Sequence, residues 1–194
     1  MKEILVFHVR LEEIFPAIWR RLELRREWTF WNLHCAIQDA MPWEDRHLHE
    51  FQFPAGDDDA RIGIPNDDYP GEEKVLPSWE TPLREWFVAT SNQCRYHYDF
   101  GDDWIHTVTL ESRRPAEPGG RYPRCTAGER RCPPEDVGGP FGYQHFLEAM
   151  LDPGHEDHAQ FRDWIGMDWD PERFSPDEVT FSVASRRLRR AGLG

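Results

Sequence analysis

The stretch of residues 94–111 constrains the fold more than any other part of this sequence. Two runs of alternating apolar and polar residues, each with the two-residue period of a half-buried strand, flank the turn Gly101-Asp102-Asp103. A three-residue loop would pair Phe100 with Trp104 and place both apolar sets on one face. The stretch therefore predicts a central antiparallel hairpin. Its apolar sets are Cys94, Tyr96, Tyr98 and Phe100 before the turn, and Trp104, His106, Val108 and Leu110 after it.

The N-terminal residues predict a second group of strands with one helix. Residues 4–11 and 18–24 alternate in the same way and are predicted to form a hairpin. Thr29 is a suitable N-cap for a helix whose apolar residues recur every three or four positions until Pro42 ends it. Residues 47–53 predict a third strand. The first third of the chain is thus strand, strand, helix, strand.

Two segments rich in proline and glycine predict irregular connections. Residues 54–82 leave room for one short strand, and Asp57-Asp58-Asp59 within them is interpreted as a solvated loop, because the glycine and the distant glutamate of an EF-hand are missing. One or two helical turns at 82–89 then lead into the central hairpin. Residues 125–139 hold too many prolines and glycines for regular structure.

The C-terminal part predicts helices. Residues 143–151 match the helical spacing of apolar positions, and a further helix is expected from about 155 to 165. Ser175-Pro176 is a strong helix start, although the alternation at 179–183 also suits a strand. The tail 186–190 contains four arginines, which favour the C-terminal end of a helix and could alternatively contact nucleic acid.

These patterns together predict a single α+β domain of residues 1–194. A mixed or antiparallel sheet is expected from the N-terminal and central hairpins, with helices packed against it and a C-terminal helical cap. Possible sub-layers are residues 1–53 and residues 83–190.

Composition narrows the classes of partner and compartment. The net charge of −13 repels a phosphate backbone and disfavours nucleic acid as a partner. No run reaches the 18 apolar residues of a membrane span, and the N-terminus lacks the pattern of a signal peptide. We therefore expect an acidic cytoplasmic protein whose four cysteines are reduced thiols or metal ligands rather than disulfides.

A metal site is one hypothesis for the cysteines. Cys125 and Cys132 are separated by six residues, and His106 could complete a set of ligands with them. The spacing is wider than in a zinc knuckle, so we expect no cofactor and keep zinc as the alternative. Further histidines that could contribute are His97, His155 and His158, the last two one helical turn apart.

Acidic residues suggest a second constellation. Carboxylates at the hairpin tip and in the later loop could line one cleft with His106 and hold magnesium for phosphodiester chemistry. Asp and Gly are also the ordinary residues of tight turns, so a structural role is the competing interpretation. The candidate catalytic residues are Asp99, Asp102, Asp103 and His106, and Glu135 and Asp136 come from the later loop.

Three strings of residues also resemble a known family. Residues 98–106, residues 125–139 and Pro16-Ala-Ile-Trp-Arg20 are similar to the Ri-plasmid ORF-3-like family over roughly residues 4–188. The resemblance implies a bacterial protein associated with plasmids or mobile elements, and some relatives carry a resolvase-like label. A serine recombinase needs an early nucleophilic serine, whereas the first serine here is Ser78. Strand exchange by that mechanism is therefore rejected.

The sequence favours a non-enzymatic binding or interaction module, with an unspecified protein or small molecule as its partner. The expected surface is the tip of the central hairpin beside the loop of residues 125–139. One alternative is a metal-dependent hydrolase or nuclease that uses the same carboxylates, and another is association with DNA through the arginine tail. The expected binding residues are Trp104, Asp102, Asp103, Glu135 and Asp136, with His106 beside them.

Overall fold

The computed structural model describes residues 2–53, 60–65, 75–88, 92–166 and 168–193, and their strands form one sheet. The strand order is β5-β4-β3-β6-β7-β1-β2-β8, antiparallel except between β4 and β5. The predicted α+β fold with a mixed sheet is confirmed. The strands are β1 Glu3–Leu11, β2 Ile18–Arg25, β3 His49–Phe53, β4 Ala60–Gly63, β5 Val75–Pro77, β6 Gln93–Tyr98, β7 Trp104–Pro115 and β8 Arg124–Glu129. The helices are α1 Phe30–Ala40, α2 Leu83–Trp86, α3 Gly139–Leu151, α4 His158–Ile165, the 3₁₀ turn η1 Pro176–Glu178 and α5 Ala184–Arg190.

The two predicted hairpins are neighbours in the sheet. Strand β1 pairs with β2 on one side and with β7 on the other, so the N-terminal hairpin and the central hairpin share one continuous surface. Strands β6 and β1 flank β7 in the sheet, and its alternating apolar residues face the core. Residues 57–59 lie outside the described residues.

The register of the central hairpin differs from the prediction. Tyr98 rather than Phe100 pairs with Trp104, so residues 99–103 form a five-residue loop. Asp99 and Asp103 adopt positive φ angles of 55° and 62°, which aspartate tolerates better than most residues. The shift of two positions keeps the apolar side chains of β6 and β7 on their predicted face. Phe100 is released from the core and is 48 % exposed.

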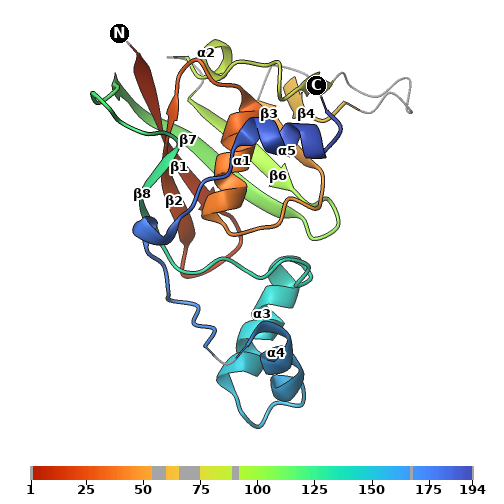
Figure 1. Cartoon of the computed structure of the whole chain (residues 1–194). Coiled ribbons are helices and arrows are strands. Elements are labelled where there is room, and N and C mark those ends of the chain that lie inside the picture. The colour runs from red at the N-terminus through yellow and green to blue at the C-terminus, as the bar shows by residue number, and fades with distance from the viewer. Residues whose placement is uncertain (1, 54–59, 66–74, 89–91, 167, 194) are drawn as a thin grey trace.

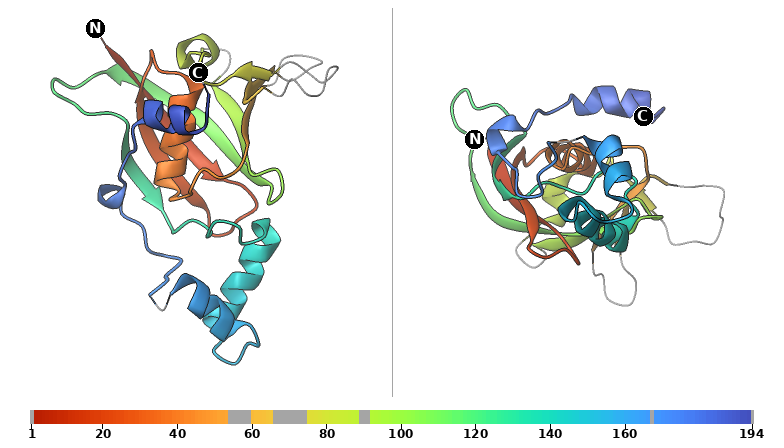
Figure 2. Two further views of the ribbon diagram at one scale, coloured as in Figure 1. Left: turned by 45° about the vertical axis from the view of Figure 1, so that its right-hand side comes forward. Right: turned by 90° about the horizontal axis from the view of Figure 1, so that it is seen from below.

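Helix α1 covers the concave face of the sheet (Figures 1 and 2). The Asn32 side chain accepts a hydrogen bond from the Thr29 backbone N–H at 3.1 Å, which supports the predicted start. Phe30 packs against Phe51 and Phe87 with ring centroids 5.0 and 5.8 Å apart. The core therefore lies between α1 and the sheet.

Residues 124–129 form strand β8, whereas the sequence predicted irregular structure there. The strand pairs with β2 at the edge of the sheet. Gly128 allows this arrangement, because a Cβ atom at that position would lie 2.5 Å from Phe174 and 2.7 Å from the Trp19 carbonyl oxygen. The glycine thus marks a place of close packing rather than a break in the strand.

The C-terminal part extends away from the sheet and α1, which we call the body, and then returns to them. Helices α3 and α4 extend below the sheet as a helical hairpin, and the following segment runs back to place α5 against α1 (Figure 1). The helix predicted from Ser175 is only the turn η1, and residues 179–183 form neither helix nor strand. Val179 and Phe181 instead pack against the core, so burial fixes this segment without regular hydrogen bonds.

Candidate functional site

The tip of the central hairpin touches the loop that precedes α3. The Gly138 backbone N–H donates to Asp102 Oδ2 at 3.0 Å. Gly139, with φ of 69°, lies so close to the Asp102 carbonyl oxygen that a Cβ atom would be 2.3 Å from it. The two regions singled out from the sequence therefore meet, and Asp102 is one of the residues that joins them.

Carboxylates from both regions converge on His47, which precedes β3. The His47 Nε2 atom lies 2.8 Å from Asp136 Oδ1, 3.5 Å from Asp99 Oδ2 and 3.9 Å from Glu135 Oε1. The side chains of Asp99 and Glu135 are only 10 % and 11 % exposed. Even with a protonated imidazole, this group would hold an excess of negative charge in a partly desolvated place. We call these four residues the His47 cluster.

Glu135 is fixed by two hydrogen bonds. The Tyr98 hydroxyl donates to Glu135 Oε1 at 2.5 Å, and the Glu44 backbone N–H donates to Oε2 at 2.7 Å. Burial, together with the hydrogen bond to Glu135, raises the pKa of Tyr98 well above its ordinary value. Tyr98 therefore stays protonated and remains a donor, and Glu135 keeps its place at the edge of the cluster.

The other predicted residues lie elsewhere. Asp103 Oδ1 lies 2.7 Å from His97 Nε2, away from the His47 cluster. Trp104 is 1 % exposed and packs near Trp43, so it is a core residue rather than a surface contact. His106 is fully buried, and burial lowers its pKa to about 3. Both side chains face the core because β7 presents that face to α1.

The structure does not gather the predicted cysteine ligands. Cys132 is buried next to Arg20 and Met41, and burial raises the pKa of its thiol to about 11. The Cys125 thiol instead donates to the Ala127 carbonyl oxygen at 3.3 Å. Among the described residues, the groups suited to a metal ion are His47 with Asp99 and Asp136, and His145 with His155 and Asp157.

A cleft of about 380 Å³ opens beside the His47 cluster. Its lining combines the loop around Pro133 and Pro134 with Trp164 and Trp169, which come from the helical hairpin and the segment after it. Glu135 and Asp136 line the same cleft, so two carboxylates of the His47 cluster border it. The cleft thus combines an apolar, aromatic surface with an excess of carboxylates. Its remaining lining residues are Met41, Pro42, Glu44, Arg46, Arg131, Cys132 and Ile165.

Comparison with known proteins decides the family. The model of the plasmid pRiA4b ORF-3-like protein family matches residues 3–178. The chain belongs to this family. It is 36 % identical over 158 residues to the uncharacterized protein y4hQ of Sinorhizobium fredii (strain NBRC 101917 / NGR234), across 81 % of this chain and 78 % of that protein. The crystal structure of MM3350, a protein of unknown function from Methanosarcina mazei Go1, has a TM-score of 0.85 and 38 % identity, covering 93 % of this chain and 99 % of that one.

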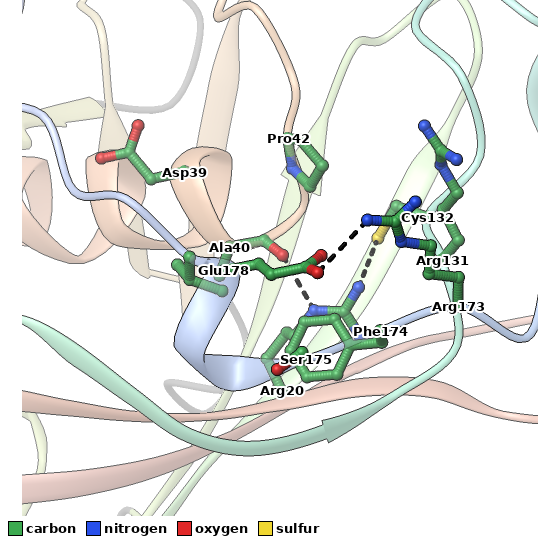
Figure 3. A pocket seen from close by; sticks show the side chains of 11 residues that line it. Arg20, Asp39, Ala40, Pro42, Arg131, Cys132, Arg173, Phe174, Ser175 and Glu178 are labelled. Carbon is green, nitrogen blue, oxygen red and sulfur yellow. Dashed lines mark hydrogen bonds and ion pairs between the residues drawn. The ribbon is translucent and has the colours of Figure 1, made fainter.

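A second pocket of this ORF-3-like chain adjoins the cleft and shares Pro42, Arg131 and Cys132 with it (Figure 3). Its floor is the buried Arg20 guanidinium, which donates to the Ala40, Trp19, Glu129 and Arg130 carbonyl oxygens at 2.7–2.9 Å. The Phe174 ring lies over this guanidinium, with 3.7 Å between the ring centroid and Arg20 Cζ. Arg20 therefore holds β2, α1 and the segment after β8 together, and its donors are already engaged.

Sequence reasoning missed His47. It lies far from the other cluster residues along the chain, and only the pairing of β3 with β6 brings it to the hairpin tip. Of the arginine tail, Arg187 pairs with Asp39 at 2.5 Å and with Asp45 at 3.3 Å, which fastens α5 to the body. Association of this tail with DNA stays a prediction. No helix among the described residues is long and apolar enough to cross a membrane.

Proposed function

We propose that this protein is a non-enzymatic binding module whose cleft takes a segment of a partner protein with a basic side chain flanked by apolar residues. The observation that carries the proposal is the uncompensated negative charge of the His47 cluster at one end of an apolar cleft. A guanidinium or ammonium group placed there would balance that charge. The net charge of −13 would also steer a basic partner toward the protein.

The apolar residues of the cleft favour a ligand that has apolar groups as well as a positive charge. Trp164 is 48 % exposed, although tryptophan is among the residues that gain most from being covered. Pro134, which is partly exposed, and the largely buried Pro133 line the same cleft. An aliphatic or proline residue next to the basic group would fit between these surfaces.

The shape of the site supports an extended ligand. The cleft and the second pocket are neighbours, because Pro42, Arg131 and Cys132 line both of them. A peptide in extended conformation could follow both hollows and place its basic side chain at the acidic end. This requirement separates a peptide from a compact small molecule.

The test compares two sets of fluorescent octapeptides by anisotropy. One set has a central arginine between leucine and proline residues, and the other has glutamate at that position. We expect the arginine set to bind, and Asp136→Asn and Trp164→Ala each to weaken binding by about tenfold or more. Glu80→Gln is the matched control, because it removes one negative charge at an exposed position that lines neither hollow. Equal affinity for both sets, or no binding of either, would reject the proposal.

A divalent cation at the same place is the second candidate. The ligand atoms of His47, Asp99 and Asp136 lie within 4.8 Å of one another, which suits one ion. The protein would then be a metal-dependent hydrolase of phosphodiesters or related esters, with the ion polarising the substrate. Manganese-dependent cleavage of bis(p-nitrophenyl) phosphate that Asp136→Asn abolishes would favour this candidate. Absence of metal-dependent cleavage at saturating manganese would leave the peptide proposal in first place.

A further inference from the structure

A second group of metal-binding side chains lies where α3 turns into α4, separate from the His47 cluster. His145 is on α3, and His155 and Asp157 belong to the connection that leads into α4. The His145 Nε2 atom lies 3.0 Å from Asp157 Oδ2, and His155 Nδ1 lies 4.0 Å from the same oxygen. The centroids of the His145 and His155 imidazole rings are 5.2 Å apart. Three ligand-bearing side chains thus meet at one point.

The donors and their spacing suit zinc. Two imidazoles and one carboxylate form a common zinc ligand set that leaves the fourth position to water. Zinc bonds of about 2.0–2.2 Å in tetrahedral geometry separate neighbouring ligand atoms by roughly 3.3–3.5 Å. The three ligand atoms lie within 4.8 Å of one another, so small side-chain rotations would be enough to enclose an ion.

The environment leaves the site accessible. The side chains of His145, His155 and Asp157 are 49 %, 25 % and 35 % exposed, so an ion and its water ligand can reach them. The Asp157 backbone N–H donates to His155 Nδ1 at 3.1 Å, and an ion would take the lone pair that this contact now uses. The Asp157 backbone N–H would then donate to a water molecule instead, which costs little free energy at an exposed position.

The sequence alone pointed to a different pair. His155 and His158 are one helical turn apart, but the His158 Nδ1 atom is bonded to the Ala149 carbonyl oxygen at 2.7 Å. The partner that tertiary structure supplies is His145, twelve residues from Asp157. Because the enclosed loop is short, bringing the ligands together costs little chain entropy.

Helix α4 is packed only lightly against the rest of the helical hairpin. None of the eight described residues of α4 is fully buried. Helix α4 is held to α3 by the edges of a small aromatic group that contains Phe146, Phe161 and Trp164. We propose that His145, His155 and Asp157 bind one zinc ion with a water as fourth ligand, and that the ion fastens α4 to α3.

The test is titration of the chelator-treated full chain with Zn²⁺ by calorimetry, with Co²⁺ absorption as a report of tetrahedral geometry. We expect about one ion per chain. Loss of an outer-sphere partner alone weakens metal sites by about 10–100-fold, so removal of a ligand in His145→Ala or Asp157→Asn should weaken binding by at least about 100-fold. His47→Ala is the matched control and should leave this affinity unchanged.

Each contrary result is decisive. No Zn²⁺ binding at micromolar concentration, or binding that His47→Ala abolishes and His145→Ala retains, would overturn the proposal. Circular dichroism of each variant checks folding, and Asp157→Asn, which keeps the size of the side chain, separates loss of a ligand from loss of the hairpin. The peptide assay is independent of this measurement, so either proposal can fail alone.

Discussion

The sheet body and the α3–α4 hairpin use aromatic residues in opposite ways. In the body, nine of the eleven residues of α1 are buried, and Phe30 lies among other rings with no exposed surface. In the hairpin, none of the eight described residues of α4 is fully buried, and Phe141 is 86 % exposed. The body thus encloses most of its aromatic side chains, with Phe15 and Phe100 as exposed exceptions, whereas the hairpin buries Tyr143 and Phe146 but leaves Phe141 and Trp164 at the surface.

This difference explains where the candidate site lies. His47 and Asp99 of the cluster are attached to the well-packed body through β3 and the hairpin tip, and hydrogen bonds from Tyr98 and the Glu44 backbone N–H hold Glu135. The facing wall of the cleft comes from the less buried hairpin, where local opening costs less free energy. A binding site with one rigid wall and one adaptable wall suits a peptide ligand.

Replacing a core ring in each region should give the largest contrast in stability. Phe30→Ala removes a fully buried ring and should lower the free energy of unfolding by about 3–5 kcal/mol. Phe161→Ala removes a partly buried ring of the hairpin and should cost about 1–2 kcal/mol. Urea denaturation measures both, and equal losses would contradict the comparison.

Arg20 holds β2 and α1 to the segment after β8, which leads to the hairpin, and its removal should give the next largest effect. Arg20→Met leaves the Ala40, Glu129 and Arg130 carbonyl oxygens without their buried donor, which should cost about 2–4 kcal/mol. Arg20→Lys should recover part of this loss, because an ammonium group can reach one or two of the acceptors. Urea denaturation of the two variants gives the difference, and identical losses would mean that the guanidinium geometry is unimportant.

The body should also respond to pH through a buried histidine. Burial holds the pKa of His106 at about 3 in the folded state, below its ordinary value of 6.5. The unfolded state therefore binds the extra proton first, and stability is lost as pH falls from 6.5 toward 3, by about 1.4 kcal/mol per pH unit. In His106→Leu, the slope of the unfolding free energy against pH should be smaller by about 1.4 kcal/mol per pH unit in this range. An unchanged slope between pH 6 and 4.5 would show that His106 does not titrate on unfolding.

The smallest effect is expected at the surface of the C-terminal segment. Arg173 and Glu178 form an ion pair at 3.2 Å whose side chains are 59 % and 61 % exposed. Glu178→Gln should change the unfolding free energy by no more than about 0.5 kcal/mol, because solvent and salt screen such pairs. A loss above 1 kcal/mol in a thermal melt would mean that this segment is coupled to the core more tightly than its exposure indicates.

Local patterns in the sequence determined most of the elements. The alternation in β1, β2, β6 and β7 predicted both hairpins and the face that each side chain takes, because the period of a strand is independent of its partners. Thr29 and Pro42 marked the limits of α1 for equally local reasons. The meeting of the hairpin tip with the loop before α3 was also expected.

Tertiary structure alone decided the register, the edge strand and the chemistry of the cluster. The loop of residues 99–103 depends on aspartates that accept positive φ, and β8 forms because β2 offers an unpaired edge. Tertiary packing also made His106 a core residue and brought His47 into the cluster. Alternation fixes which side chains share a face, but only the packing of α1 and the pairing of distant strands determine which face is buried and which residues meet.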